Sequence, residues 1–141
     1  RLLKTIMELG EELRSQMTNL VGLEILYEKA LYPELEYIFK HAITQEVVYN
    51  NLLKKERREI HERVGAVIEQ LFKDRLSEFY ETLAYHFRLG QSRPKAVDYL
   101  IKSGIKSLKR YALDEAHRYF QEAYDILSSQ LKAHFCHGAN I

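Results

Sequence analysis

Hydrophobic positions near the start of the chain follow two different periods. From Leu2 to Val21 they recur at helical spacing, and Gly22 is a suitable helix end. From about residue 24 to 40 apolar and polar residues alternate, and Pro33 between the two runs cannot lie in a central strand. The pattern therefore predicts helical structure followed by one β-hairpin, the only one in the chain.

Helical spacing returns after the hairpin. Thr44 is expected to cap the next helix, with Glu46 in its first turn. The segment "KERREIHERVGAVIEQLF" predicts a longer helix whose charged residues and His61 face solvent. Its buried stripe is expected to contain Ile60, Val64, Val67, Ile68 and Leu71.

Three more helices are predicted at about 77–89, 94–111 and 114–129, with Pro94 at a favourable first position. Short connections predict that neighbouring helices are antiparallel. The remaining tail, 131–141, lacks a clear period and is expected to fray. The inner stripe of the third helix is expected to contain Leu113, Ala116, Phe120, Ala123 and Leu127.

Small and aromatic residues in these helices have the spacing of tetratricopeptide helix pairs, in which small residues let two helices approach and a large one fills the neighbour's groove. The spacing predicts about one and a half repeats that share helix 94–111, with the helix of Ile60 to Leu71 covering the first end. A generic three-helix bundle is the alternative. The residues concerned are Leu83, Ala84, Phe87, Ala96, Leu100, Gly104, Ala116, Phe120 and Ala123.

The composition is that of an ordinary globular protein. Of 141 residues, 46% are apolar and 29% charged, and 20 acidic residues nearly balance 21 basic ones, which argues against nucleic acid or an anionic membrane as partner. The single cysteine excludes an intrachain disulfide and fits a reducing, cytoplasmic location. No stretch approaches the roughly 20 apolar residues that span a bilayer.

The sequence carries no pattern of catalytic chemistry. Phosphate-binding glycine loops, a nucleophile elbow and zinc-protease motifs are all missing, and the carboxylates lie beside Lys or Arg as in a solvated ion-pair face. We therefore expect a non-enzymatic chain without cofactors. The ten tyrosines are suited to helix packing or to contacts with a protein partner.

Histidines are the remaining candidates for a site. His41 lies at the change from strand to helix, where it could act as a switch or ligand, or close the helix start by bonding a backbone group. His86 is expected to be packed and hydrogen-bonded at a helix interface, and His117 to lie on the surface.

One cluster contains ligand types for a soft metal: His134, Cys136 and His137. Zinc sites generally combine two ligand pairs separated by a loop, and no second pair occurs. A metal site there is the weaker reading, and a frayed or non-native tail is the stronger one.

The stretch "LEYIFKHAITQEVVYNNLLKKERREIHERVGAVIEQL" resembles a segment of large bacterial signalling proteins. These couple a class III adenylate/guanylate cyclase, or another effector, to a STAND-type (AAA-like) ATPase module and then to tetratricopeptide repeats. The hairpin resembles the wing of the winged-helix-like element that follows their ATPase core. The family's pattern is matched by Tyr37, Phe39, His41, Ala42, Glu46, Tyr49, Leu52 or Leu53, and His61.

The resemblance implies a mainly α fold: a winged-helix-like element with one β-hairpin (1–53, hairpin about 24–40), antiparallel tetratricopeptide-like helices (54–130) and a tail (131–141). It implies a non-catalytic regulatory module, excised from a larger protein, that relays nucleotide state to helical repeats and contacts protein partners or other domains of its parent. In some STAND ATPases a histidine of the winged-helix element approaches the phosphate of the bound nucleotide, so the resemblance also implies that His41 is a nucleotide sensor in the parent. The family's nucleotide-binding and cyclase motifs lie outside this chain, so the resemblance implies no catalytic residues here.

Three alternatives stay open. The first is a free-standing tetratricopeptide-like adaptor that binds a protein or peptide. The second is a winged-helix DNA binder that contacts DNA through Arg14, Gln16 and Asn19. Two acidic residues on the same helix, Glu11 and Glu12, and a net charge of only +1 argue against it. The third concerns assembly, since an apolar face exposed by excision would favour a homodimer of the isolated chain.

Overall fold

The computed structural model describes residues 10–31 and 34–138, and places side chains within 12–29 and 36–132. The chain divides into two compact units, Arg1–Arg57 and Arg58–Ile141. The sequence places this division slightly earlier, after Leu53. Each unit is considered by itself below.

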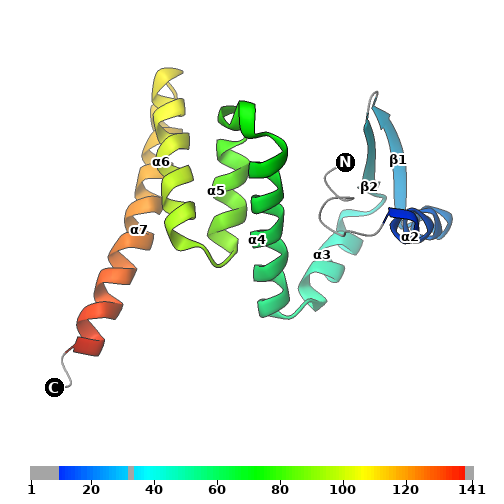
Figure 1. The fold of residues 1–141 in the computed structure, drawn as a ribbon, viewed down its shortest axis with the longest axis horizontal. Helices are drawn as coiled ribbons and strands as arrows, with labels where there is room; N and C mark the ends of the chain where they lie inside the picture. The colour runs from blue at the N-terminus through cyan, green and yellow to red at the C-terminus, as the bar shows by residue number, and fades with distance from the viewer. Residues whose placement is uncertain (1–9, 32–33, 139–141) are drawn as a thin grey trace. The chain divides into compact units, whose positions relative to one another are not determined.

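The first unit contains α2 (Gly10–Gly22), β1 (Leu26–Leu31), β2 (Glu34–Phe39) and α3 (Ala42–Asn51), as Figure 1 shows. The two strands pair antiparallel, with Leu26 opposite Phe39 at one end and Leu31 opposite Glu34 at the other. The predicted hairpin is therefore confirmed, and it is the only sheet in the described ranges. The predicted turn at Tyr32 and Pro33, and the first turns of the predicted N-terminal helix, lie outside those ranges.

The helix after the hairpin begins earlier than the sequence suggested. His41, in extended conformation, is the residue before α3, and its carbonyl oxygen accepts the backbone N–H groups of Thr44 and Gln45. Thr44 therefore lies inside the first turn instead of capping it. The expectation failed because it took a cap from residue type alone, whereas here the backbone of the strand end sets where the helix begins.

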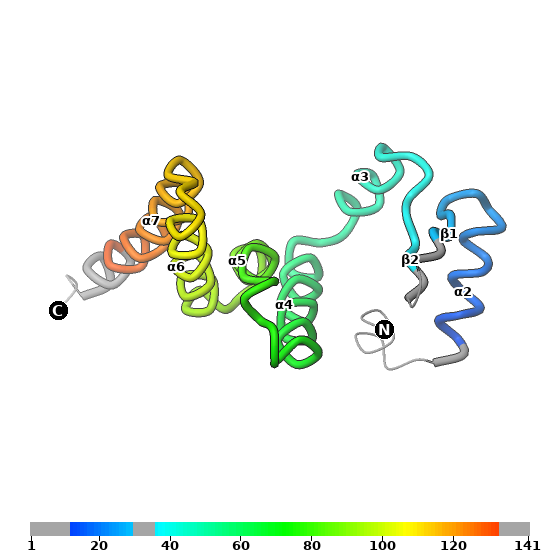
Figure 2. The backbone as a smooth tube through the Cα atoms, turned by 90° about the horizontal axis from the view of Figure 1, so that it is seen from above, coloured from blue at the N-terminus to red at the C-terminus, as the bar shows by residue number. Residues whose placement is uncertain are grey.

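The second unit consists of helices. These are α4 (Lys54–Leu71), which starts in the first unit, the short 3₁₀ helix η1 (Lys73–Glu78), α5 (Tyr80–Leu89), α6 (Arg93–Lys109) and α7 (Leu113–Gly138). In Figure 2, α5, α6 and α7 follow one another as neighbours. The mainly α class with one β-hairpin is thus confirmed. No helix in the described part of the chain is long and apolar enough to cross a membrane.

Two glycines set the helix spacing in this unit. A Cβ added to Gly65 of α4 would lie 2.8 Å from Cζ of Phe87 in α5, and one added to Gly104 of α6 would lie 2.6 Å from Cε1 of Phe120 in α7. The same contact therefore recurs in two helix pairs, α4 with α5 and α6 with α7. Helix α6 also packs against both α5 and α7, as expected for a helix that is shared by two neighbouring pairs.

The buried face of α4 differs from the predicted stripe. His61, Gly65, Val67 and Ile68 are buried, whereas Ile60 is 46% exposed. The expectation that His61 faces solvent was wrong. Hydrophobic periodicity could not identify this face, because neither glycine nor histidine is a hydrophobic residue. Gly65 is buried because it allows close helix approach, and His61 because it has a polar partner.

The end of the chain also differs from the prediction. In α7, Ala116 and Ala123 are buried as expected, but Leu113 and Leu127 are 65% and 44% exposed. The helix runs on to Gly138, well beyond its predicted end at Ser129. The backbone of the presumed tail is thus mostly helical.

The carboxylate of Glu62 connects α4 to the start of α6. Its Oε2 accepts the backbone N–H groups of Gln91 at 2.8 Å and Ser92 at 3.0 Å, and its Oε1 accepts the Ser92 hydroxyl. Burial alone raises the pKa of Glu62, but these hydrogen bonds from Ser92 and Gln91 outweigh it and hold the pKa below its usual value. A side chain of one helix thereby satisfies the free donors at the beginning of another.

The connection from α6 to α7 is tight. The N–H of Ala112 donates to the carbonyl of Ser107, and Tyr111 adopts φ = 60°, in the left-handed region. The Tyr111 side chain is 90% exposed at this turn.

We predict that Gly104→Val lowers the free energy of unfolding by about 2 kcal/mol, because the added carbons collide with the Phe120 ring. Urea denaturation provides the measurement. Ile101→Val on the exposed side of the same helix is the control and should change stability by at most about 0.5 kcal/mol. Adding Phe120→Leu should recover part of the loss, and strictly additive effects would contradict the proposed contact.

Candidate functional site

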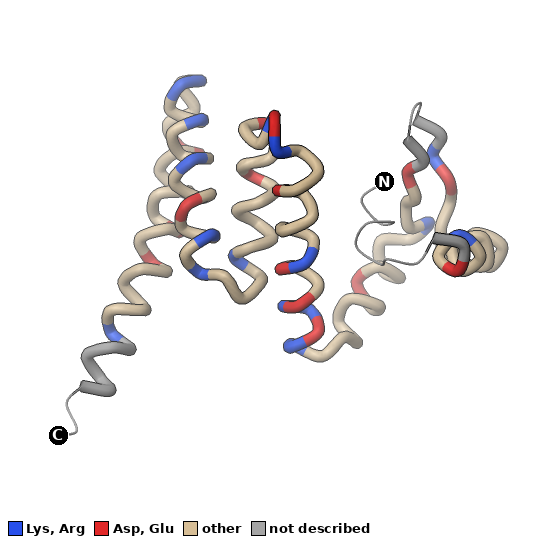
Figure 3. Tube along the Cα trace, in the orientation of Figure 1, with Lys and Arg blue, Asp and Glu red and all other residues tan. Residues whose placement is uncertain are grey.

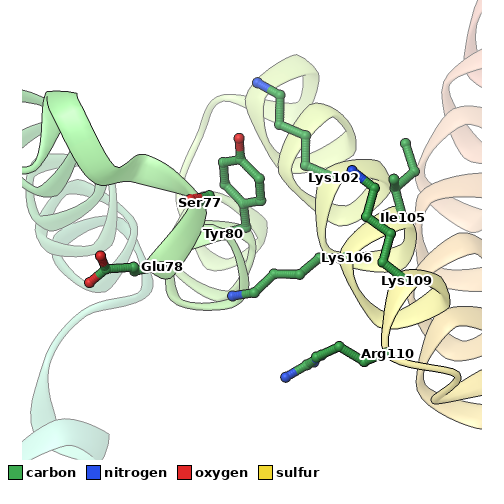
Figure 4. Close-up of a pocket in the computed structure, with 8 residues that line it drawn as sticks. All are labelled: Ser77, Glu78, Tyr80, Lys102, Ile105, Lys106, Lys109 and Arg110. Carbon is green, nitrogen blue, oxygen red and sulfur yellow. The ribbon is translucent and has the colours of Figure 1, made fainter.

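The second unit contains a pocket of about 560 Å³ between α6 and the segment from the end of η1 to the start of α5. Four of its eight lining residues are cations and one is an acid, and Figure 4 shows them. Sequence reasoning missed this pocket. The signal was present as basic residues at helical spacing along α6, which Figure 3 shows in blue. The lining residues are Ser77, Glu78, Tyr80, Lys102, Ile105, Lys106, Lys109 and Arg110.

Carboxylates outside the pocket lining hold three of these cations in place. Lys106 Nζ donates to Glu81 at 2.8 Å, and Lys102 Nζ donates to Asp98 at 2.7 Å. Arg110 lies 3.7 Å from Glu81 and 3.5 Å from Glu115. Lys109 forms no ion pair with any residue that the structure describes.

Aromatic rings form the wall beside these cations. Lys102 Nζ lies 4.9 Å from the ring centroid of Tyr99 and 5.8 Å from that of Tyr80, within the range of cation–π attraction. The buried Tyr99 hydroxyl donates to Glu69 at 2.6 Å. Burial first, and then the Glu69 carboxylate, raise the pKa of Tyr99, so the phenol stays protonated and fixes the ring.

The groups that line the pocket are suited to binding a ligand. Ser77 is its one hydroxyl besides that of Tyr80, and no described contact joins Ser77 to a histidine or another base that would activate it. Within the described ranges no three residues of the types His, Cys, Asp and Glu are placed to hold a metal ion. Flexible ammonium groups beside apolar carbons are suited to an anionic ligand with an apolar part.

A second cluster joins α4 and α5 through two histidines. The Nδ1 atoms of His61 and His86 lie 3.0 Å apart, so one ring donates a proton to the other. His61 is 7% exposed, and Tyr85 lies edge-on to both rings. The expectation of a packed, hydrogen-bonded His86 is confirmed, and its partner is the histidine that the sequence placed in solvent.

This environment favours the neutral rings. Burial lowers the pKa of His61, and burial together with the neighbouring His61 lowers that of His86 to about 4. A proton added to either ring would place a charge in a half-buried site beside another donor. The pair therefore joins α4 and α5 through a hydrogen bond between two neutral rings.

His41 is exposed at the start of α3, and its side chain makes no capping hydrogen bond. The expectation that the ring closes the helix start is therefore wrong, since the backbone carbonyl serves that purpose. His117 is exposed on α7, as expected.

The cluster of His134, Cys136 and His137 lies outside the residues whose side chains the structure describes. On α2, Arg14, Gln16 and Asn19 are exposed, and so is the nearby Glu12.

The surface of α3 is apolar yet uncovered. None of its residues is buried, and Ile43, Val47 and Val48 are 71%, 54% and 49% exposed. Leu53, just beyond the helix, is 68% exposed. We call these four side chains the α3 surface.

Comparison with known proteins shows a similarity over part of the chain but assigns it no function. No family model matches the chain, and no solved structure matches it. An uncharacterized protein of Rhizobium meliloti (strain 1021) is 30% identical to the chain over 92 residues. These residues are 64% of this chain and only 9% of the relative, so the chain spans less than a tenth of the relative's length.

We predict that acid destabilises the second unit through the histidine pair. The unfolded chain binds a proton at His86 below about pH 6.5, whereas the folded chain does so only near pH 4. The free energy of unfolding is therefore highest above pH 6.5 and falls as the pH decreases toward 4. Between pH 7 and 4.5 it should fall by about 2 kcal/mol. Urea denaturation over this range measures the effect.

The His86→Gln variant should lose most of this pH dependence. The variant His117→Gln removes an exposed histidine and should keep it. Identical pH profiles for wild type and His86→Gln would show that the pair is not its source.

Proposed function

We propose that the chain is a non-catalytic regulatory and protein-interaction module of a larger bacterial signalling protein. In this proposal the first unit contacts a neighbouring STAND-type ATPase domain, and the second unit belongs to the helical repeats that receive its nucleotide state. The observation that carries the proposal is the α3 surface: a set of apolar side chains on and just after a helix none of whose residues is buried.

The energetics of α3 support a missing partner. Burying a Val, Leu or Ile side chain stabilises by about 1.5–3 kcal/mol, so the α3 surface leaves several kcal/mol of stabilisation unused. Its ten residues form a helix of a length that is marginal in water without tertiary packing. Contiguous apolar surface of this kind typically marks an interaction site.

The position of α3 adds to this argument. It lies in the stretch that resembles the segment after the ATPase core of the signalling family, and the exposed ring of His41 directly precedes it. We propose that another domain of the parent protein covers α3 and brings His41 toward the bound nucleotide. The far greater length of the bacterial relative is consistent with such a parent.

The second unit also exposes apolar side chains where further helices would pack. They follow helical spacing on α6 and α7, the pattern expected when a stack of helix pairs continues. We propose that they contact further repeats of the parent. These side chains are Ile101, Leu108, Leu113, Tyr124, Leu127 and Leu131.

A free-standing adaptor is the second candidate, and the basic pocket is the observation that favours it. An adaptor needs a ligand site of its own, and this pocket lies wholly within the second unit. A native gene product no longer than these residues would favour the adaptor over the regulatory module.

We expect the isolated chain to neither hydrolyse ATP nor bind it with micromolar affinity, because the proposal places the nucleotide site in another domain. Isothermal titration calorimetry with Mg-ATP checks this, with Mg-GTP in parallel. Micromolar affinity for either would contradict the regulatory module.

We further expect the double change Ile43→Asp and Val47→Asp to leave the thermal stability of the isolated chain nearly unchanged, since both side chains are exposed. In the full-length protein it should change ATPase activity severalfold and increase cleavage near α3 in limited proteolysis. Gln45→Asp, at an exposed polar position of the same helix, is the control and should do neither. Unchanged activity and cleavage in the double variant would contradict docking through α3.

A further inference from the structure

We propose that the basic pocket binds an acidic polypeptide segment, with carboxylates along the row of α6 cations and an apolar side chain beside Ile105 and Tyr80. The proposal rests on the protein-interaction function above and names the class of partner. It concerns a site that is separate from the α3 surface.

The charge distribution provides the attraction. The lining contributes four cations against the single carboxylate of Glu78, and that carboxylate lies 3.5 Å from Arg75, which is not part of the lining. The carboxylates that contact Lys102, Lys106 and Arg110 also lie outside the lining. The lining is therefore predominantly cationic, although carboxylates outside it pair with three of the four cations.

These ion pairs also position the cations in advance. The side chains of Lys102 and Lys106 are 41% and 30% exposed, so each is partly covered and partly open to solvent. Ordering a free lysine side chain costs up to about 2 kcal/mol, and here much of that ordering precedes binding. Lys109, without an ion-pair partner in the described residues, is the cation with most to gain from a ligand.

The shape of the row favours a polypeptide over a phosphate group. Lys102 to Arg110 covers about 12 Å of helix at 1.5 Å per residue, which matches about four residues of an extended peptide. Compact phosphate sites instead concentrate backbone N–H groups at a glycine-rich loop or helix start. Here the donors are side chains distributed along the second half of α6.

The volume and the apolar lining of the pocket determine what the peptide must contain besides carboxylates. About 560 Å³ is within the usual range of ligand pockets, and Ile105, 45% exposed, provides apolar surface between the cations. A peptide that alternates acidic and aliphatic residues would satisfy both kinds of wall. An all-acidic peptide would leave Ile105 uncovered.

The test uses the whole chain and a fluorescein-labelled peptide of about ten residues that alternates Glu and Leu, a length that exceeds the row. Fluorescence anisotropy should show saturable binding that weakens with salt, and replacing every Glu with Gln in the peptide should abolish it. Lys109→Glu should weaken binding about fivefold, as expected for the loss of one exposed ion pair.

Matched variants separate the pocket from general charge effects. Lys132→Glu makes the same charge change at an exposed position of α7 that does not line the pocket, and it should bind normally. Ile105→Ala should weaken binding of the Glu–Leu peptide and leave weaker binding of an all-Glu peptide unchanged. Circular dichroism checks that each variant is folded.

Three results would overturn the proposal: no saturable binding, equal weakening by Lys109→Glu and Lys132→Glu, or displacement of the peptide by tripolyphosphate at concentrations far below those of unlabelled peptide. The last result would show a phosphate site. Because Ile43→Asp with Val47→Asp should bind the peptide normally, failure at the pocket and failure of docking through α3 are distinguishable.

Discussion

The close approach of helices at two glycines is the constraint on which the second unit depends. Phe87 lies over Gly65 and Phe120 over Gly104, so neither glycine can carry a side chain without moving a ring. At this separation Glu62 reaches the N–H groups of Gln91 and Ser92, just before α6, and His61 reaches His86. The pocket lies at a different contact, between α6 and the segment that leads into α5.

The first unit, in contrast, has few buried side chains. Among its described side chains only Leu26 is buried, and the two strands of the hairpin pair antiparallel. Small two-stranded sheets are marginal in water unless another surface covers them. A unit with so little core of its own is suited to respond to what it contacts, which is the property that a relay between domains requires.

Hydrophobic periodicity in the sequence predicted the hairpin and most of the helices. The buried face of α4 and the pocket depend on contacts between residues and were not predicted. Alternation and Pro33 were sufficient to predict the hairpin, and three of the helices were found close to their observed bounds. The buried face of α4 was misplaced because Gly65 and His61 are core residues for reasons that hydrophobicity does not measure. The pocket was missed because lysines at helical spacing usually indicate a solvated face, and the residues opposite them come from a distant part of the sequence.

The turn between α6 and α7 has a consequence for evolvability. Tyr111 holds a left-handed backbone conformation, which costs a non-glycine residue roughly 1–2 kcal/mol, and its ring, 90% exposed, recovers almost none of this by packing. A glycine there would relieve the strain without disturbing any helix contact. Substitution of Tyr111 by glycine would thus stabilise the unit and compensate for destabilising substitutions elsewhere in it.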